Sequence, residues 1–288
     1  MTETGTLPMT AFVNPIAITE SEILADKRFP IKVVPTVEAL WDDFACELAA
    51  LIKANNVVSR RTTVILPVGP FDYRRVAALF NSEQISCAQI ITFNMDEYCD
   101  AQGRMIPWEH PLSFRSFMKT NFYDVLAPHL RPRPENMVFP DPQQPEAVGR
   151  RIADEGGIDA CYGGFGIDGH FAFNVPPWPD EPQDSSYFDL PTRLVRLTPE
   201  TRAQSAFGCT SGDIASIPHM AVTIGMREIM GSARMRVYLM RPWQCSVLRR
   251  VLYGPITPRY PASILQQHPD LSVTMVEYVL RQPRLCPG

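Results

Sequence analysis

Short, mainly apolar runs alternate along this chain with segments whose apolar residues recur at helical spacing. Residues 31–35 and 62–69 are runs of strand length, and residues 37–54 between them carry apolar side chains every three or four positions. A strand that is apolar throughout is buried on both faces, which happens where helices cover both sides of a parallel sheet. The alternation therefore predicts an α/β protein with a single doubly wound, mostly parallel sheet and helices on both of its faces.

The same pattern extends through the rest of the chain. Further strands are expected at residues 88–93, 160–162, 194–197, 220–224, 236–240 and 271–276, and further helices at residues 73–80, 113–125, 145–155 and 245–253. Many of the 28 prolines gather in residues 128–145 and 176–191, which are predicted to be loops. Residues 1–30 are expected to form an N-terminal extension, and residues 31–288 one Rossmann-like domain.

Charge, cysteine spacing and hydropathy argue against several classes of protein. The formal net charge is −4 and the paired arginines are dispersed, so no nucleic-acid partner is expected. The seven cysteines and five histidines form neither a CxxC nor an HxxxH pair, so neither a metal site nor a disulfide framework is expected. The N-terminus lacks a signal-peptide pattern and no apolar run could span a bilayer, so a cytoplasmic protein without a membrane partner is expected.

The stretch GGFGIDGHFAFN, residues 163–174, is named the glycine loop here. It places Asp168 and His170 two residues apart, where both side chains of an extended segment point to the same side. A carboxylate beside an imidazole can move protons near neutral pH. Glycines such as Gly166 let the backbone approach a small ligand closely. The alternative is structural, because Asp-Gly is a common turn dipeptide and a histidine beside it can simply pack.

Two more polar segments follow predicted strands. ITFNMDEY, residues 91–98, ends an apolar pattern with Asp96 and Glu97, and another turn follows Leu66. In doubly wound sheets, ligands bind beyond the carboxyl ends of the strands, so these turns and the glycine loop are expected to meet at one edge of the sheet. The structural alternative is that Asp96 or Glu97 only caps the next element.

Together these segments resemble the glucosamine-6-phosphate deaminase/isomerase family, which shares a scaffold with the 6-phosphogluconolactonases. The likeness covers roughly residues 31–280. It continues through HPLSFRSFMKTNFYDVL (110–126), TRLVRLTPETRAQSAF (192–207), IPHMAVTIGMREIM (217–230) and LQQHP (265–269). The segments TFNMDEY and HPLSF favour the deaminase branch over the lactonase branch.

The resemblance implies a mechanism and a set of catalytic residues. Asp96 matches the base that moves a proton between C2 and C1 of the open-chain sugar through an enolamine. His170, oriented by Asp168, matches the group that opens the pyranose ring. Water then adds to the imine and ammonia leaves, which gives a ketose. The family needs no metal or other cofactor, and the resemblance also implies a homo-oligomer, a trimer or a hexamer.

The chain departs from the family beside the histidine. The family carries a glutamate five residues after the histidine, and this chain has Val175 there. The imidazole of His170 thus lacks one carboxylate that would hold it charged and oriented. Asp180 or Glu181 is the nearest replacement in the sequence.

The phosphate-binding segments differ too. The family's turn Pro-Thr-Gly-Gly-Ser/Thr-Pro cradles a phosphate with amides and a hydroxyl. At its place Pro70 removes an amide donor, Phe71 removes the hydroxyl and Asp72 adds a repelling charge. The family's phosphate arginine and lysine align with Ala206 and Gln244. The nearby arginines that could compensate are Arg74, Arg202 and Arg241.

These departures shape the expected ligand contacts. Arg193 matches an arginine of the family's allosteric site, but Val195 replaces its lysine, so allosteric activation by an amino-sugar phosphate is not expected. The predicted substrate-binding residues are Gly69, Pro70, Phe71, Glu97, Gly166, Arg193, Arg202 and Gln244. The lid is expected between residues 192 and 220.

The leading interpretation is an aldose–ketose isomerase or deaminase that acts on a sugar, an amino sugar or their phosphates. One alternative is a lactonase-type sugar hydrolase, in which His170 activates water. Another is a catalytically degenerate sugar-binding or regulatory protein, which Val175 and the altered turn favour and the intact Asp96, Asp168 and His170 oppose.

Overall fold

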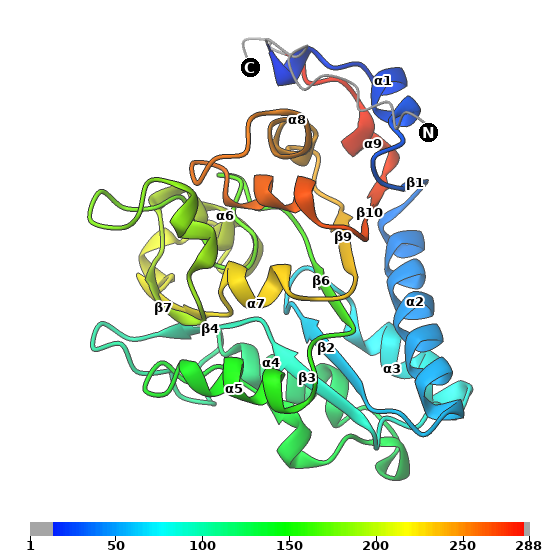
Figure 1. Ribbon diagram of the computed structural model, residues 1–288. Coiled ribbons are helices and arrows are strands. Elements are labelled where there is room, and N and C mark those ends of the chain that lie inside the picture. Colours follow the sequence, from blue (N-terminus) through cyan, green and yellow to red (C-terminus); the bar gives the residue numbers. More distant parts are fainter. Residues whose placement is uncertain (1–13, 285–288) are drawn as a thin grey trace, which may run out of the picture.

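A parallel sheet runs through the centre of the computed structural model, which describes residues 14–284 (Figure 1). Its strands stand in the order β1 (Ile31–Val34), β10 (Leu271–Val276), β9 (Met235–Leu239), β6 (Ala160–Gly163), β2 (Thr62–Leu66), β3 (Ile90–Asn94) and β5 (Met137–Val138). All neighbouring strands pair in parallel. The predicted mostly parallel sheet is confirmed, although β5 falls in a segment that was predicted to be a loop.

Helices cover both faces of this sheet, as predicted. One face packs against α2 (Val37–Val57), α3 (Tyr73–Ser82) and the continuous α4 (Phe114–Met118) and η2 (Lys119–Tyr123). The opposite face packs against α5 (Glu146–Asp154), α7 (Met226–Met230), α8 (Gln244–Tyr253), η7 (Pro261–Gln267) and α9 (Glu277–Leu280). Successive residues of β2 serve the two cores in turn, because side chains alternate along a strand: Val64 and Leu66 face α2, and Ile65 faces the other side.

A second, smaller sheet stands beside the first. It consists of β4 (Asp96–Cys99), β8 (Met220–Thr223) and β7 (Arg193–Arg196), paired antiparallel in the order β4-β8-β7. Two predicted strands, at 194–197 and 220–224, therefore lie outside the parallel sheet. The strands of this small sheet pack against α6 (Pro199–Cys209) and form a small hydrophobic core of their own. Ala206 of α6 and Ile217, which follows η6 (Ile214–Ser216), belong to this core.

The remaining described elements are short. They are η1 (Pro15–Ala17), α1 (Glu20–Ala25), η3 (Pro128–Leu130), η4 (Pro134–Asn136) and η5 (Ser185–Asp189). The two proline-rich segments hold only β5 and single helical turns, in line with the prediction of loops. No helix within residues 14–284 has the length and apolar character needed to cross a bilayer.

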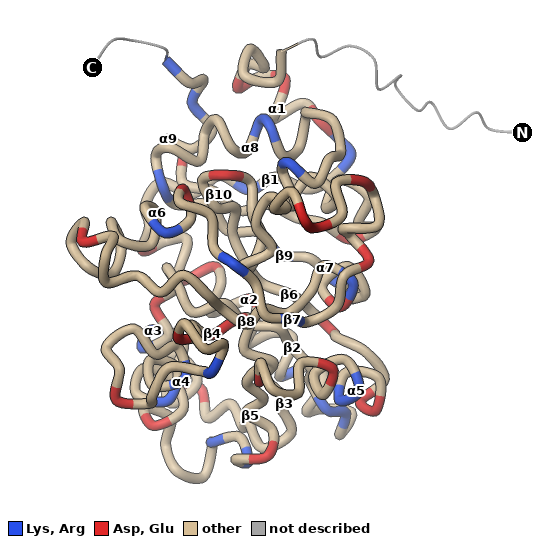
Figure 2. The backbone as a smooth tube through the Cα atoms, turned by 90° about the vertical axis from the view of Figure 1, so that its left-hand side faces the viewer, with Lys and Arg blue, Asp and Glu red and all other residues tan. Residues whose placement is uncertain are grey.

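The first described residues pack onto the end of the chain. Figures 1 and 2 place α1 close to α8 and α9. The fully buried Arg249 of α8 explains this contact, because its guanidinium donates to the carbonyls of Ile18 (2.7 Å) and Leu280 (2.8 Å). Residues 14–30 of the predicted N-terminal extension are thus held against the body; the rest of it, residues 1–13, lies outside the described part of the chain.

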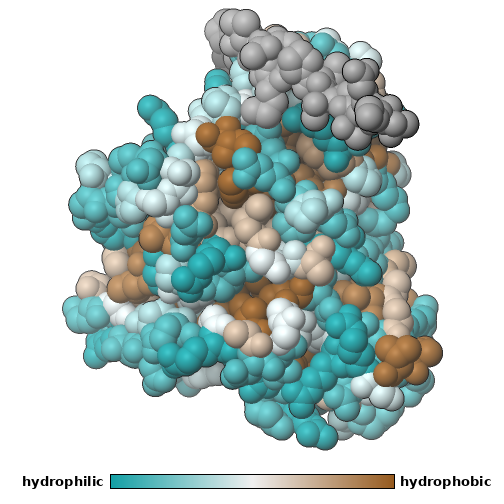
Figure 3. All heavy atoms as spheres, viewed as in Figure 1, coloured by the Kyte–Doolittle hydropathy of each residue, from teal (hydrophilic) through white to brown (hydrophobic). Residues whose placement is uncertain are grey.

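The surface carries charge of both signs. Figure 2 shows Lys and Arg interspersed with Asp and Glu, and Figure 3 shows a largely polar face with separate apolar patches. Among the exposed apolar residues are Val57 and Val58 at the end of α2 and Phe207 on α6.

The strand order fixes where a ligand can approach. From β2 the chain continues to β3 on one side, and β6 adds to the other side. The loops that follow β2 and β6 therefore diverge at a topological switch point, where doubly wound folds form their crevice. The glycine loop follows β6, so the switch point carries Asp168 and His170.

Candidate active site

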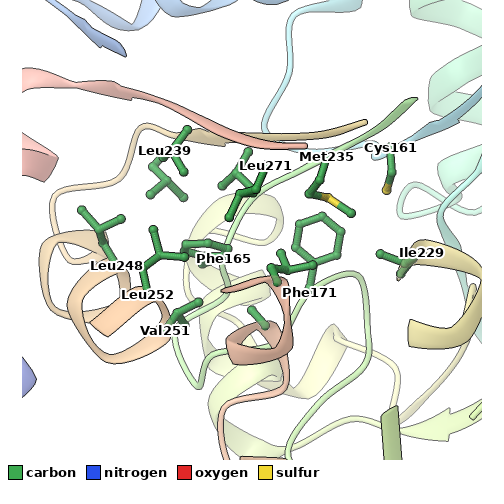
Figure 4. Close-up of a cluster of buried hydrophobic side chains, with 14 of the residues drawn as sticks. Cys161, Phe165, Phe171, Ile229, Met235, Leu239, Leu248, Val251, Leu252 and Leu271 are labelled. Atoms are coloured by element: carbon green, nitrogen blue, oxygen red, sulfur yellow. The ribbon is translucent and has the colours of Figure 1, made fainter. Parts of the chain in front are cut away.

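The glycine loop is a tight turn that the core holds in place. Its Gly166 N–H donates to the carbonyl of His170, and its Gly169 N–H donates to the carbonyl of Gly166, both at 2.9 Å. A Cβ at Gly166 would lie 2.0 Å from Nε2 of His170, so only glycine lets the imidazole pack against the backbone. Figure 4 shows Phe165 of this loop beside Leu248 and Leu252 of α8, and Phe171 beside Met235 of β9; this packing anchors the turn.

Asp168 and His170 form a buried pair. Nδ1 of His170 lies 2.7 Å from Oδ1 of Asp168. Oδ2 of Asp168 accepts hydrogen bonds from the hydroxyls of Thr198 (2.6 Å) and Thr201 (2.9 Å). Oγ1 of Thr201 also lies 2.9 Å from Nδ1 of His170. The predicted pair therefore exists, and two threonines that were not predicted as site residues complete it.

The threonines come from the start of α6, which was also not predicted. Thr198 caps this helix and Pro199 is its first residue, a typical start signal that the sequence carries as Thr-Pro-Glu-Thr. Recognition of this signal would have placed a helix here. It would not have shown that the helix begins at the Asp168 carboxylate, because that contact spans some thirty residues.

Asp168 is held in its charged form. Burial by itself would raise the pKa of Asp168, but the positive charge of protonated His170 and the hydrogen bonds from the imidazole and both threonine hydroxyls outweigh burial. The pKa of Asp168 therefore lies well below its ordinary value. A carboxylate of this kind stabilises an imidazolium beside it.

Asp96 stands in the opposite electrostatic situation. It begins β4, is 8% exposed and pairs with Thr223 of β8. Within residues 14–284 its carboxylate accepts no hydrogen bond. Burial, and then the charge of Glu97, raise the pKa of Asp96 well above its ordinary value. Asp96 therefore keeps its proton to a higher pH than an exposed aspartate does.

A short chain of contacts joins Asp96 to the glycine loop. The hydroxyl of Thr223, the strand partner of Asp96, accepts a hydrogen bond from Phe173 N–H at 3.0 Å. The ring of Phe173 in turn lies 6.3 Å from the imidazole of His170. Asn174 adds a second link, since its amide donates to the Ile224 carbonyl at 2.8 Å. These contacts tie β8, the strand partner of Asp96, to the glycine loop that carries Asp168 and His170.

Glu97 lies apart from them and is fully buried. Its carboxylate accepts hydrogen bonds from the Ser113 hydroxyl (3.1 Å) and from the backbone N–H groups of Phe114 and Arg115 (both 3.0 Å). It also pairs with the Arg115 guanidinium at 3.2 Å. Glu97 therefore fastens the start of α4 to β4, which explains why TFNMDEY and HPLSF occur together.

The segment at residues 67–72 aligns with the family's phosphate-binding turn and is named the distal turn here. Its side chains and its Pro70 carbonyl contact the rest of the protein. Phe71 is 4% exposed, and its ring lies 4.5 Å from that of Phe44 and 5.7 Å from that of Tyr238. The indole of Trp41 donates to the Pro70 carbonyl at 3.0 Å. Among the predicted contact residues of this turn, Gly69 alone is exposed.

The amides at the start of α3 are also occupied. The carboxylate of Asp72 accepts hydrogen bonds from the N–H groups of Arg74 (3.1 Å) and Arg75 (3.2 Å). These are donors with which a helix start can hold an anion. Asp72 therefore supplies an internal anion at the distal turn.

Neutral buried groups stand where the resemblance expects phosphate-binding cations. Gln244 is 5% exposed; its amide donates to the Phe165 carbonyl at 2.8 Å, and its oxygen accepts from the N–H groups of Met240 and Arg241, both at 2.8 Å. Ala206 is fully buried. Gln244 thus ties the start of α8 to the glycine loop.

The two remaining arginines of the predicted set have internal partners. Arg193 donates to the side chains of Asn174 (2.8 Å) and Tyr187 (3.1 Å). Arg202 donates to the carbonyls of Ile214 and Ile217 and thereby fastens η6 to α6. Their predicted substrate contacts stay predictions.

The place of the family glutamate is apolar in its surroundings as well as in its sequence. Val175 is 2% exposed and packs in the core of the small sheet. Asp180 pairs with Arg196, and Glu181 accepts a hydrogen bond from Trp178 N–H. Neither carboxylate contacts His170 within the described residues, where the imidazole has Asp168 and Thr201 as its hydrogen-bond partners.

A surface hollow of about 510 Å³ adjoins this site. Asp168, Thr198 and Tyr260 are part of its lining, whereas Asp96 and His170 are not. The site is therefore defined by the contacts above rather than by the hollow. No group of three or more His, Cys, Asp or Glu residues suited to a metal ion occurs within residues 14–284.

Comparison with known proteins identifies the family of the chain. No family model matches the chain. Glucosamine-6-phosphate deaminase of Aeromonas hydrophila is 31% identical over 204 residues, which cover 68% of this chain and 70% of that protein. The enzyme of the same name from Parabacteroides distasonis is 28% identical over 278 residues, which cover 88% of this chain and 97% of that protein.

Solved structures give the same result. A monomeric glucosamine-6-phosphate deaminase matches with a TM-score of 0.73 at 26% identity, covering 87% of this chain and 98% of that one. A 6-phosphogluconolactonase from Trypanosoma brucei matches with a TM-score of 0.62 at 16% identity, covering 87% and 97%, so it shares the fold alone. The parallel sheet with its surrounding helices is the fold that these deaminases and lactonases share. The chain belongs to the glucosamine-6-phosphate deaminase family, and the resemblance seen in the sequence is confirmed.

Proposed function

We propose that this protein is an aldose–ketose isomerase or deaminase for a sugar or amino sugar, with Asp96 as its proton-shuttling base. The observation that carries the proposal is the Asp96 carboxylate. It is buried, accepts no hydrogen bond within the described residues, and lies at the rim that holds Asp168 and His170. A base with a raised pKa suits proton transfer between neighbouring carbons, since it can both take up and return the proton.

In the proposed mechanism the two carboxylates act at different steps. His170 exchanges a proton with the ring oxygen as the pyranose opens, and Asp168 stabilises the imidazolium that forms. Asp96 then moves a proton between C2 and C1 of the open chain. If the substrate carries an amino group at C2, water adds to the imine and ammonia leaves. A positioned acid–base group contributes about 10²–10⁴-fold to the rate.

The substrate is proposed to lack the usual 6-phosphate or to carry another group there. Gln244 and Ala206 stand in the places of two cations, and charge-assisted hydrogen bonds contribute about 1.5–3 kcal/mol each. Loss of two weakens phosphate binding by about two to four decades. Arg74 and Arg241 are the exposed arginines closest in sequence to this end of the site.

The expected setting of the enzyme follows from its family. We propose a small-molecule sugar or sugar phosphate as its partner, the cytoplasm as its location and a homo-oligomer as its state. One similar solved deaminase is described as monomeric, so the oligomeric state needs a direct measurement by sedimentation or light scattering.

The proposal is tested with Asp96→Asn, which keeps the size of the side chain and removes the base. We expect turnover to fall about 10²–10⁴-fold while sugar-induced thermal stabilisation is kept, since the residue acts on a proton rather than on binding. Asp189→Asn, at an exposed aspartate, is the matched control and should leave both unchanged. Ketose and ammonia are measured over a panel of phosphorylated and unphosphorylated amino sugars.

The outcomes separate the alternatives. Equal loss of turnover and binding in Asp96→Asn would refute its role as the base. Hydrolysis of a sugar lactone without ketose or ammonia would identify a lactonase. A sugar that stabilises the wild-type protein but is never converted would identify a sugar-binding protein.

A further inference from the structure

The first turn of α6 contacts both members of the Asp168–His170 pair. Thr198 and Thr201 are 8% and 0% exposed, and their hydroxyls reach Oδ2 of Asp168 at 2.6 Å and 2.9 Å. Oγ1 of Thr201 lies 2.9 Å from Nδ1 of His170. The sequence separates the threonines from the pair by some thirty residues, so these contacts are tertiary and cross from the glycine loop to α6.

The hydrogen-bond donors among Thr198, Thr201, Asp168 and His170 can be assigned from the number of protons that these groups carry. A hydroxyl carries one proton and a carboxylate none. The Thr198 proton goes to Asp168, because its 2.6 Å contact is the shorter and charge-assisted one, and its oxygen accepts from Thr201 N–H at 3.1 Å. The Thr201 proton goes to Asp168 as well. Oγ1 of Thr201 and Oδ1 of Asp168 are then both acceptors toward Nδ1 of His170.

This assignment fixes the tautomer of the imidazole. With two acceptors facing it, Nδ1 carries the proton, and Nε2 keeps its lone pair when His170 is neutral. Within the described residues Nε2 has no hydrogen-bond partner, and the ring is pressed against the backbone of Gly166. Nε2 is therefore the atom that can exchange a proton with a ligand.

We propose that Thr201, supported by Thr198, is a positioning residue that holds His170 in the Nδ1-protonated tautomer and orients it through Asp168. This inference rests on the proposed function for its kinetic consequence but not for its structural one. With Val175 in place of a carboxylate, the threonine hydroxyls of α6 are the groups that brace the pair within the described residues.

The test uses the full chain and three substitutions. Thr201→Val removes the hydroxyl and keeps the branched shape, whereas Thr201→Ser restores the hydroxyl. Thr274→Val is the matched control, because Thr274 of β10 is buried (8% exposed) and its hydroxyl donates to another aspartate, Asp43, at 3.1 Å. Thermal unfolding confirms that each variant is folded.

We expect kcat to fall about ten- to a hundredfold in Thr201→Val, as for the loss of one hydrogen bond to a charged group, with KM nearly unchanged. The kcat of Thr201→Ser should return to within a few-fold of the wild-type value, and the kcat of Thr274→Val should equal the wild-type value. If Thr201→Ser is as impaired as Thr201→Val, or if Thr201→Val is fully active, the positioning role is wrong.

A second readout does not depend on turnover. Nitrogen chemical shifts of ¹⁵N-histidine report the tautomer of each of the five histidines, and His170→Gln assigns the signal of His170. We expect an Nδ1-protonated ring in the wild type and in Thr201→Ser. In Thr201→Val, Oδ1 of Asp168 is the one acceptor left at Nδ1 within the described residues, so we expect the Nδ1-protonated form to lose part of its population. An Nε2-protonated ring in the wild type would overturn the inference. A protein that converts no sugar but shows the expected shifts would refute the proposed function and keep this inference.

Discussion

The two ends of the candidate site differ in what their buried groups do. At the rim that carries Asp168 and His170, polar side chains of the glycine loop and of the start of α6 are buried against one another. The buried Asp96 carboxylate and Nε2 of His170 have no hydrogen-bond partner within the described residues. At the distal turn, Phe71 fills the core and Asp72 caps α3, so the groups there serve the protein itself.

The difference teaches which part of the family's chemistry this chain keeps. Burial of an ionisable group without a partner lowers the stability of the folded protein, and such groups are concentrated at functional sites. Asp96 is buried, and its carboxylate accepts no hydrogen bond within the described residues. Such an arrangement indicates proton chemistry. The distal turn, in contrast, contains no such free group apart from the exposed backbone at Gly69, which is the basis for proposing that phosphate recognition has changed.

The largest expected effect comes from Asp168→Asn at the reacting rim. An amide cannot stabilise the imidazolium of His170, so kcat/KM should fall about 10²–10⁴-fold. Steady-state kinetics on the substrate found with the sugar panel measure this effect. Activity close to wild type would show that the pair is structural.

Replacement by asparagine should change the free energy of unfolding in opposite directions at Asp168 and at Asp96. The pKa of Asp168 is lowered by folding, so its contribution to stability is present above the unfolded pKa and is lost as the pH falls through the folded one. The pKa of Asp96 is raised, so its contribution is present below the unfolded pKa and is lost as the pH rises through the folded one. At pH 7.5 we therefore expect Asp168→Asn to lower, and Asp96→Asn to raise, the free energy of unfolding in urea. Shifts of the same sign would contradict the assigned environments.

At the distal turn the largest effect should fall on stability. Phe71→Ala removes a ring from a packed aromatic cluster and should lower the free energy of unfolding by ~3–5 kcal/mol. Phe207→Ala is the control, since Phe207 is 83% exposed and should change stability by no more than about 0.5 kcal/mol. Urea unfolding measures both. A small loss in Phe71→Ala would mean that its ring is available to a substrate.

Much of the fold follows from the sequence, and the exceptions have physical causes. Most strands of the parallel sheet are short, mainly apolar runs, so their pattern is visible without the structure. β5 is the exception, because two residues carry too little pattern. Asp96–Cys99 was read as a polar strand end, since its pairing with β8 depends on a segment more than a hundred residues away. The short α7 and the polar start of α6 lack a long apolar stripe and were missed for that reason.

The candidate site shows the same limit. Asp96, Asp168 and His170 are visible because their residue types and motifs carry chemistry. The roles of Glu97 and Gln244 cannot be predicted from the sequence. Each side chain binds backbone groups of the protein, and the residue type does not distinguish this from binding a substrate. Thr198 and Thr201 were missed because their function depends on a tertiary contact alone.

The most direct test of the contrast between the two ends is the affinity of Asp96→Asn for one amino sugar with and without its 6-phosphate, measured by titration calorimetry. Asp96→Asn holds the sugar without converting it. If the distal turn is closed as described, removal of the phosphate should change the dissociation constant by less than about tenfold, which corresponds to about 1.4 kcal/mol. A phosphorylated sugar that binds a hundredfold or more tightly would show that other residues rebuild the phosphate site, and would contradict the account.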